Sequence, residues 1–422
     1  MSCLVDINAM LDRPEPPSTG DCCIYKVPSK LRKLNEDAYT PTVVSIGPFH
    51  HGQPQLQNME RHKLIYFKAF LQRTNACLNT LVIYIESILS DFNGCYSETL
   101  PFSHNELVML ILTDSAFIIE FFLRTCCEGD TFKPWLDSHI TSDLLLLENQ
   151  LPFFVIEKIY SLSLSSTNAS VPDTMIPSFL QLTIGCFGCF GYFKAKLAFD
   201  NGDISIRHFT DLIRIFHLYH PIESRPSRNR IDEQIIHRPS ATELVEAGVR
   251  FKVNTKSECL FDLRFSGGVL EIPSLIVEDR TETLFRNMVA LELCHYPKES
   301  YIIDYVAILD YLINTGTDVD ILVQNKILHN WLGDSHSVAN LFNGLCINVV
   351  HYNISSQFSV LCKELNAFCR NPWNKLKATL RRDYCNTPWK TAASIAGVLL
   401  LVLTIIQTVC SVLQVVQQSN GS

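Results

Sequence analysis

The amino-acid sequence predicts a mainly α-helical protein, with a large helical globular domain, one small β-hairpin element and a C-terminal single transmembrane helix. Three observations predict this fold class. Apolar residues recur at helical spacing through most of the chain, and two capping boxes mark where helices begin. A Ser-Gly-Gly turn between short apolar runs indicates a hairpin. An uncharged apolar run at 391–416 is long enough to cross a bilayer.

The beginning of the chain has weak signals for regular structure. Residues 1–21 read as a flexible lead-in, without the basic start and apolar core of a secretory signal peptide. Three prolines interrupt residues 24–51, which we therefore expect to be irregular, with at most a short edge strand. A long helical stretch begins near Leu56, and its apolar spacing resumes through 78–89.

The middle of the chain alternates between predicted helices and loops. Ser103 and Glu106 form the first capping box, ahead of an apolar helix predicted for 107–123. The leucine-rich segment 140–150 is predicted to be another helix. Two loops are predicted from a serine-rich segment and from a segment rich in proline and mixed charges, at 161–173 and 221–239.

The second capping box, Ser240 and Glu243, predicts a short helix that stops at Gly248. The hairpin is predicted from residues 260–265 and 269–272, on either side of the Ser-Gly-Gly turn. Further helices are predicted at 282–294, 301–313, 319–328, 338–345 and from 371 or 372 to about 384.

The apolar run near the C-terminus predicts attachment to a lipid bilayer. It contains no Asp, Glu, Lys, Arg or His, and a helix satisfies its backbone hydrogen bonds internally within a membrane. Thr387 and Pro388 suit the cap and first turn of this helix. The predicted organisation is a lead-in at 1–21, a helical domain at 22–385, a juxtamembrane linker at 386–390, the transmembrane helix at 391–416 and a polar tail at 417–422.

Charge and cysteine content limit the class of protein. The net charge of −8 gives no global basic field for nucleic acid, so we expect no nucleic-acid partner. The 16 cysteines are scattered over a long chain, whereas disulfide frameworks are typical of small secreted domains. We expect mostly reduced, buried cysteines, with some disulfides as the alternative.

Basic residues gather before the apolar run and none follows it. They are Arg370, Lys375, Lys377, Arg381, Arg382 and Lys390. By the positive-inside rule, this asymmetry predicts a cytoplasmic domain, at the plasma membrane or an endomembrane. The cluster can attract anionic lipid headgroups or serve only as a topological signal, and the sequence leaves both readings open.

Two kinds of modification site bear on which side of the membrane the domain lies. Cys385 lies near the expected membrane surface and is a candidate for S-acylation. Asn168 and Asn353 begin Asn-X-Ser sequons, which are glycosylation candidates if the domain is extracellular. The sequons therefore support the orientation opposite to the one that the basic residues predict.

Five segments occur in an order that is typical of one protein family. They are AYTPTVVSIGPFHHG at 38–52, DLLLLENQLPFFVIEKI at 143–159, PSATELVEAGVRF at 239–251, NWLGD at 330–334 and RDYCNTPW at 382–389. From about Cys22 through the apolar run, the chain resembles the plant DUF247 family, also called UPF0481. The resemblance implies a flowering-plant protein with a C-terminal membrane segment, no established enzymatic activity and no catalytic residues to transfer. Some members resemble pollen-side recognition determinants of grass self-incompatibility, a role that no motif carries to this chain.

The chemically active residue types each have a structural alternative. His50 and His51 suit metal binding or acid–base catalysis, but a metal site needs three or four converging ligands, and a docking turn is the reading we favour. Asp114, Glu120 and Glu148 lie within apolar segments. They form either a catalytic group with shifted pKa values or structural pairs with cations and helix-end amides. Candidate partners are Arg61, His62 and Lys63.

Catalytic signatures are missing from the sequence. Cys186 and Cys189 have CxxC spacing without a thioredoxin-like context, so we expect a flexible loop there. The nucleophile elbow, the phosphate-binding loop, the HExxH zinc motif and the protein-kinase set are absent. We therefore assign no catalytic, metal-binding or cofactor-binding residue and expect no cofactor.

The leading hypothesis is a single-pass membrane protein that acts in protein–protein recognition or signalling. Its expected partners are the lipid bilayer, through 391–416, and an unidentified protein, with contacts at the 161–173 and 221–239 loops. The first alternative is a membrane-tethered enzyme that uses the buried carboxylates with His50 or His51. The second is an extracellular recognition domain. The oligomeric state stays open.

Overall fold

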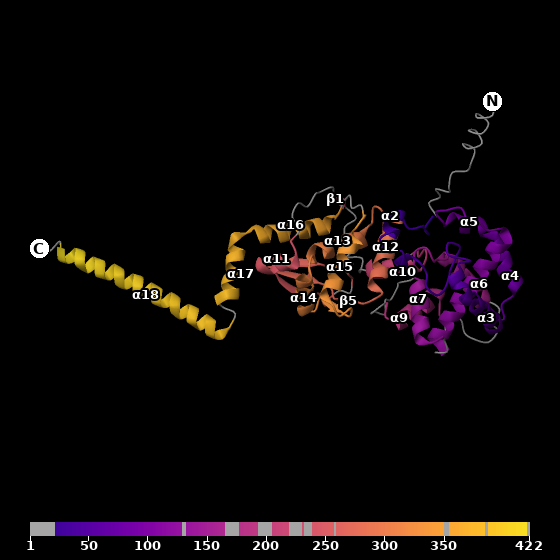
Figure 1. Cartoon of the computed structure of the whole chain (residues 1–422), viewed down its shortest axis with the longest axis horizontal. Helices are drawn as coiled ribbons and strands as arrows, with labels where there is room; N and C mark the ends of the chain where they lie inside the picture. The colour runs from indigo at the N-terminus through magenta and orange to yellow at the C-terminus, as the bar shows by residue number, and fades with distance from the viewer. Residues whose placement is uncertain are drawn as a thin grey trace, which may run out of the picture.

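Helices make up most of the computed structural model, and the strands form only small sheets, as the sequence predicts (Figure 1). The structure describes residues 22–128, 132–164, 177–192, 205–218, 230–231, 239–256, 259–349, 354–384 and 387–419. The lead-in at 1–21 and the candidate modification sites Asn168, Asn353 and Cys385 lie outside the described residues.

The first half of the body surrounds one apolar helix, α6 (His104–Leu123). This helix is buried on nearly all sides, which explains why its sequence is apolar all round instead of in one stripe. The other elements of this half are α2 (Ser29–Arg32), η1 (Asp37–Tyr39), η2 (Pro54–Leu56), α3 (Gln57–Thr74), α4 (Leu78–Ser87), α5 (Leu89–Gly94), the π-helical turn η3 (Arg124–Glu128), α7 (Pro134–Asp143), α8 (Phe153–Leu164) and α9 (Phe179–Cys189). Helix α3 packs along α6.

Both predicted capping boxes are present. The Ser103 amide donates to the Glu106 carboxylate at 2.9 Å, and the Glu106 amide donates to the Ser103 hydroxyl at 3.4 Å. The same exchange joins Ser240 and Glu243 at 3.0 and 3.3 Å. These boxes start α6 and α11 (Ala241–Glu246), and Gly248 follows α11 with a φ of +94°, as a helix stop requires.

The helix predicted for 140–150 is wrong in its second half. Helix α7 ends at Asp143, and residues 144–152 are irregular. The Asn149 side-chain amide donates to the backbone carbonyl of Asp143 at 2.9 Å. Side chains that bond to nearby backbone in this way compete with helical hydrogen bonding, which the apolar spacing alone does not reveal.

The second half of the body contains most of the remaining predicted helices, together with two, at 209–218 and 356–370, that we did not predict. Its elements are α10 (Phe209–Leu218), β1 (Arg230–Ile231), β5 (Leu275–Val277), α12 (Thr281–His295), α13 (Tyr301–Leu312), α14 (Gly316–Gln324), β6 (Leu328–Asn330), α15 (Ser335–Leu345), β7 (Ile354–Ser355) and α16 (Ser356–Arg370). The helix predicted for 319–328 is the least accurate of these, because α14 lies earlier and strand β6 occupies its expected end.

The predicted hairpin is present with a shorter first strand. Strand β3 (Arg264–Ser266) pairs antiparallel with β4 (Val269–Ile272). The two glycines between them have φ values of +58° and +75°, and a two-residue type I′ turn needs positive φ at both central positions. A third strand, β2 (Arg250–Val253), pairs parallel to β4, a contact that no local signal predicts.

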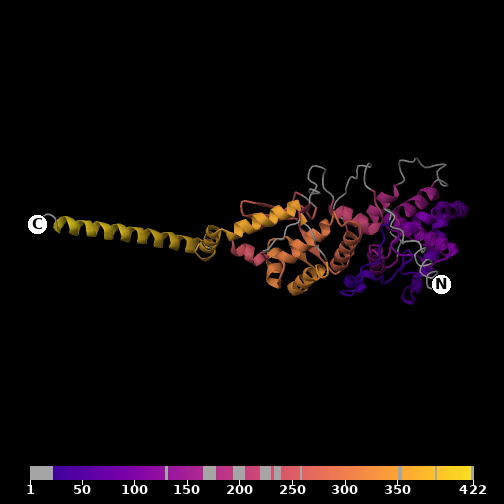
Figure 2. The same ribbon diagram turned by 90° about the horizontal axis from the view of Figure 1, so that it is seen from above.

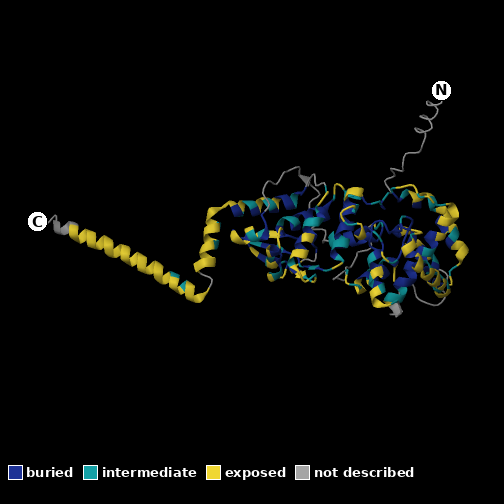
Figure 3. Cartoon of the chain, viewed as in Figure 1, coloured by how far each residue is buried: buried dark blue, intermediate teal, exposed yellow. Residues whose placement is uncertain are grey.

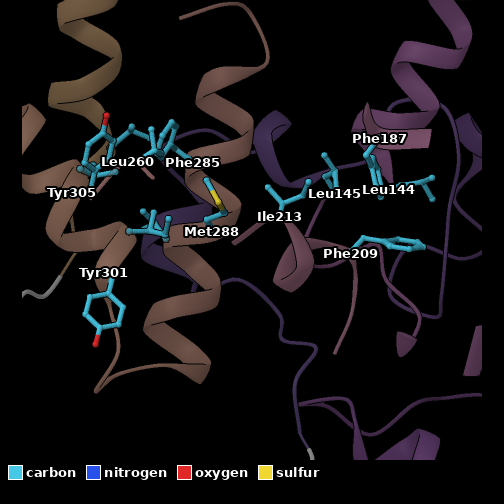
Figure 4. Close-up of a cluster of buried hydrophobic side chains, with 14 of the residues drawn as sticks. Leu144, Leu145, Phe187, Phe209, Ile213, Leu260, Phe285, Met288, Tyr301 and Tyr305 are labelled. Carbon is cyan, nitrogen blue, oxygen red and sulfur yellow. The ribbon is translucent and has the colours of Figure 1, made fainter. Parts of the chain in front are cut away.

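One cluster of buried apolar side chains runs through the body from Cys23 to Cys369. Figure 4 shows Met288 of α12, Ile213 of α10 and Leu145 in succession within this cluster. The core therefore continues from the elements of the first half into those of the second. Figure 3 shows that the buried residues gather in the body, whereas the helices at the C-terminal end are exposed.

Helices α17 (Pro372–Tyr384) and α18 (Pro388–Ser419) lead away from the body, whereas α16 packs on it through buried residues that include Phe358 and Leu361. Helix α17 is turned across the direction of the other two, and α18 extends beyond the body (Figures 1 and 2). The amide of Lys390 donates to the Thr387 hydroxyl at 3.3 Å, so the predicted cap is present. Residues 388–390, which we assigned to the linker, form the first turn of α18.

Candidate functional site

The carboxylates that the sequence places in apolar segments are paired in the structure. Asp114 accepts hydrogen bonds from Lys63 Nζ at 2.7 Å and from the Gly47 amide at 2.8 Å. Lys63 is one of the predicted partners, is fully buried and also lies 2.7 Å from Glu60. Burial raises the pKa of Asp114 above its ordinary value, and the charge of Lys63 opposes this shift.

Glu120 is held by two arginines. The Arg73 guanidinium donates to both carboxylate oxygens, from Nε to Oε2 at 2.9 Å and from Nη2 to Oε1 at 3.0 Å. Arg124 Nε donates to Oε1 at 2.8 Å, and its guanidinium lies 4.4 Å from the centre of the Tyr66 ring. Charge-assisted, two-pronged contacts of this kind fix a carboxylate in place.

Glu148 and His50 are the predicted groups that meet. His50 Nε2 lies 3.3 Å from Glu148 Oε2, and both side chains are buried. Glu148 also accepts from the Val27 amide at 2.7 Å and from Arg32 Nη1 at 2.8 Å. Burial alone would raise the pKa of Glu148, but His50, the Val27 amide, Lys26 and Arg32 together hold it below its ordinary value. Both carboxylate oxygens of Glu148 therefore already have partners within the body.

The two neighbouring histidines have different environments. Gln53 Nε2 lies 2.8 Å from His50 Nδ1, so Nδ1 acts as the acceptor, and Nε2 lies 3.3 Å from Glu148 without forming a well-aligned hydrogen bond to a described residue. His51 is exposed, and its ring makes an edge contact with Phe102 at 5.8 Å between centroids. The pair forms the docking turn that we favoured from the sequence.

The side chains of Asp143, the last residue of α7, and of Asn149, in the loop that follows, hold the mostly irregular segment at 24–52 in place. The Asp143 carboxylate accepts hydrogen bonds from the backbone amides of residues 42–44 at 3.0, 2.7 and 2.9 Å. Burial raises the pKa of Asp143 to about 6, and these amides oppose the shift. Asn149 accepts from the Ile46 amide at 2.7 Å and donates to the Val44 carbonyl at 3.0 Å. Residues 42–46, which follow α2 and η1 and belong to no helix or strand, thus have backbone groups satisfied by side chains.

Glycine is required where these two segments cross. Gly47 has a φ of +73°, and a Cβ at this position would lie 2.2 Å from the backbone oxygen of Gln150. The Tyr96 hydroxyl donates to that same oxygen at 2.9 Å. The carbonyl of Gln150 is therefore fixed from one side and leaves no room for a side chain on the other.

A second buried polar centre, which our sequence analysis missed, joins α10, α12 and α13. Arg214 Nε donates to Glu292 Oε1 at 2.8 Å, and its guanidinium stacks 3.8 Å from the centre of the Tyr296 ring. Glu292 also accepts from the amides of Ile302 and Ile303 at 3.0 and 2.9 Å. Burial raises the pKa of Glu292, and Arg214 opposes this shift. The available signal was a charged residue between apolar neighbours in each of two segments, Arg214 within LIRIF and Glu292 within ALELC.

Among the described residues, no group of three or more His, Cys, Asp or Glu side chains could bind a metal. Cys186 is buried and Cys189 is exposed, and both belong to α9. The flexible loop that we expected at this CxxC segment is therefore wrong, because the apolar sequence around it forms a helix.

Comparison with known proteins identifies the family. The family model of DUF247, described as a plant protein of unknown function, matches residues 24–403. The chain belongs to the DUF247 family. It is similar to UPF0481 protein At3g47200 of Arabidopsis thaliana, with 28% identity over 97% of this chain and 90% of the relative. It is also similar to the putative UPF0481 protein At3g02645 of the same plant, with 24% identity over 91% of this chain and 89% of the relative. No solved structure matches the chain.

In this DUF247 protein, two segments that carry the family resemblance bond to each other. Segment 38–52 supplies the backbone amides, and segment 143–159 supplies the side chains that accept them. The resemblance in these segments therefore has a structural explanation, since both sequences are needed to hold the irregular segment against the core.

Helix α18 is the feature of this DUF247 protein that points to a location. Its segment Pro388–Val415 is long and apolar enough to cross a membrane, and none of it is buried against the body. The juxtamembrane basic residues are all exposed, with Lys375, Lys377, Arg381 and Arg382 on α17 and Lys390 in the first turn of α18.

Proposed function

We propose that this DUF247 protein is a single-pass membrane protein whose helical body binds a protein partner and carries out no catalysis. The observation that carries the proposal is the exposed apolar helix α18, attached to a body with a continuous core of its own. An apolar helix of this length left in water would be costly, and a bilayer removes that cost.

The state of the polar groups supports binding over catalysis. A general acid or base must reach a substrate with a free proton or lone pair. Asp114, Glu120, Glu148 and Glu292 are buried, and each bonds to cations or backbone amides of the body. Such groups hold the fold together. His50 meets Glu148, but Arg32 and the Val27 amide share the same carboxylate.

The charge distribution supports a body on the cytoplasmic side. Four basic residues lie on α17 and Lys390 begins α18, whereas no basic residue follows in the sequence. Positive charge is retained on the cytoplasmic face of a membrane. The alternative is an extracellular body, for which glycans on Asn168 and Asn353 would be the signature.

The first experiment measures attachment and topology together. The full chain is expressed in plant cells, and membranes are extracted with alkaline carbonate, treated with protease as intact vesicles, and treated with a glycosidase. We expect resistance to carbonate, digestion of the body and no glycan on Asn168 or Asn353. Release by carbonate would contradict membrane insertion. A protected body that loses mass on deglycosylation would establish the extracellular alternative.

The second experiment tests partner binding through the predicted loops. The loops that we predicted at 161–173 and 221–239 are wrong where α8 extends to Leu164 and where strand β1 lies, so Gly-Ser replacements are confined to residues 165–173 and 221–229. Proximity labelling in plant cells then compares these variants with the unchanged chain. We expect the replaced protein to reach the membrane and to lose a specific set of labelled neighbours. An unchanged set after both replacements would contradict the assignment of these loops.

A further inference from the structure

Helix α17 carries an exposed apolar stripe. Trp373, Leu376, Leu380 and Tyr384 recur at spacings of three and four residues, so they share one face of the helix. Their exposed fractions are 74, 50, 47 and 55 %. Four large apolar side chains in a continuous row on one exposed face indicate a binding surface.

The body contacts a different face of α17. A Cβ placed on Gly248 would lie 3.1 Å from Ala378 Cβ and 3.5 Å from the backbone oxygen of Asn374. At about 100° per residue, the centre of the apolar stripe lies roughly 135° around the helix from these two residues. The small residues therefore face the body, and the apolar stripe points away from it.

The polar residues of α17 are mostly cations. The helix contains Lys375, Lys377, Arg381 and Arg382 and one acidic residue, Asp383, which gives a charge of 4 − 1 = +3. Arg382 Nε lies 3.1 Å from the Asp383 carboxylate, so the acidic charge is locally neutralised. A helix with an apolar face that contains Trp, Leu and Tyr, and with Lys and Arg elsewhere, is typical of helices that lie in a membrane interface.

The connection to α18 places α17 at the level of the lipid headgroups. The Ser394 hydroxyl of α18 donates to the backbone oxygen of Tyr384 at 3.1 Å, so the end of α17 is fixed beside the second turn of α18. The candidate span Pro388–Val415 has 28 residues, a length of about 42 Å, whereas the hydrocarbon core is about 30 Å thick. The helix is therefore longer than the core, and the charged Lys390 assigns part of the excess to its first turn, which lies at the interface.

The direction of α17 agrees with this placement. It is turned across α18 in the ribbon (Figure 1), so it lies along the membrane surface when α18 crosses the bilayer. Trp389, at the start of α18, is 86 % exposed and lies at the same level. Tryptophan and tyrosine are enriched at this depth, where an apolar ring with a polar edge is best accommodated.

We propose that α17 is a second membrane contact, which lies in the interface of the leaflet on the side of the body. Its apolar stripe enters the boundary between headgroups and acyl chains, and its basic side chains bind anionic phospholipid headgroups. The inference rests on the proposed attachment through α18 and goes beyond it, because the second contact fixes the orientation of the body and selects the lipid.

The test uses the full chain in vesicles, with Trp373 as the reporter. The chain has four tryptophans, and the variant W135F/W331F/W389F keeps only Trp373. The matched control W135F/W373F/W389F keeps only Trp331, which is 67 % exposed on the body. Vesicles contain phosphatidylcholine alone or with phosphatidylserine, and carry lipids brominated near the headgroup as quenchers. We expect Trp373 emission to shift to the blue and to be quenched more than that of Trp331, with a larger effect when phosphatidylserine is present.

A charge variant separates lipid selection from simple proximity. Replacing Lys375, Lys377, Arg381 and Arg382 with Gln should remove the increase caused by phosphatidylserine. The proposal would be overturned if Trp373 emission were quenched no more than that of Trp331. It would also be overturned if the quenching changed neither with phosphatidylserine nor on replacement of the four cations. Shielding of Trp373 that rises with the protein-to-lipid ratio would overturn it in favour of a second copy of the chain on the stripe.

Carbonate extraction of the same vesicles keeps this test apart from the proposed attachment. Protein that resists extraction while Trp373 stays unquenched refutes the role of α17 alone. Protein that is extracted refutes attachment through α18.

Discussion

The ammonium group of Lys63 lies 2.7 Å from the carboxylate of Asp114, and both side chains are buried between α3 and α6. The other carboxylate oxygen accepts a hydrogen bond from the Gly47 amide. One ion pair therefore joins two helices and the irregular segment at 24–52. An apolar pair of similar size can be as stable as a buried ion pair, but removal of one partner leaves an uncompensated charge in the core.

Replacing Lys63 with Met should lower the free energy of unfolding by about 3–5 kcal/mol, because the Asp114 charge then has no cation beside it. The double variant K63M/D114L should be less destabilised than K63M, since it removes both charges. Urea unfolding of the full chain in detergent measures these differences. Lys375→Met, at an exposed lysine, is the matched control and should change stability by less than about 0.5 kcal/mol. Equal stability of K63M and the control would contradict the buried pair.

Two glycines with similar backbone angles allow strain and crowding to be separated. Gly52 has a φ of +80° with nothing within 4 Å of an added Cβ, whereas at Gly47 the Gln150 oxygen is 2.2 Å away. Gly52→Ala should cost about 1–2 kcal/mol for the left-handed backbone alone. Gly47→Ala should cost clearly more in the same unfolding experiment, because the Gln150 carbonyl has to move. Similar costs at the two positions would mean that the loop adjusts freely.

The sequence predicted the features whose signals are local. Ser103 and Glu106 are three residues apart, as are Ser240 and Glu243, so each capping box is complete within one turn of helix. Adjacent glycines specify the turn of the hairpin. The run without charged residues specifies α18 in the same way. In each case the residues that interact are also neighbours in the chain.

Long-range pairing could not be predicted from the same signals. Arg214 and Glu292 are 78 residues apart, and a charge within an apolar pattern shows that a partner is needed without showing which one. Asp143 and Asn149 bond to a segment about 100 residues earlier in the chain. These bonds hold residues 43–46 against the end of α7 and the loop that follows it, and nothing within 140–150 indicates them.

The two adjacent histidines separate a structural role from a catalytic one. His50→Ala removes a buried ring that lies 3.3 Å from Glu148, and should cost about 1–3 kcal/mol of stability because a buried carboxylate loses a partner. His51→Ala removes an exposed ring and should stay within about 0.5 kcal/mol. Unfolding in urea compares the pair directly. If His50→Ala left stability unchanged, an acid–base role for this histidine would regain support.

Two histidines, the buried His208 and the half-buried His217, should make the protein sensitive to mild acid. Burial lowers the pKa of His208 and of His217 from the ordinary 6.5 to about 4. Between these pH values the unfolded chain binds protons that the folded chain does not, so stability is fully present above pH 6.5 and falls as the pH drops to 4. The loss is at most about 3 kcal/mol for each histidine. Asp143 acts in the opposite sense, because its raised pKa of about 6 lets the folded state bind a proton first.

Because these contributions oppose one another, the difference between a variant and the unchanged chain is the informative quantity. His217 Nε2 has no hydrogen-bond partner among the described residues, and the ring stacks on Phe285 with 6.4 Å between centroids. His217→Phe keeps the stacking and removes the titration. Its stability relative to the unchanged chain should therefore rise as the pH falls from 6.5 to 4, by at most about 3 kcal/mol. His329→Gln, at an exposed histidine, should show no such rise. A constant difference between His217→Phe and the unchanged chain across this range would mean that His217 is protonated equally in the folded and unfolded states.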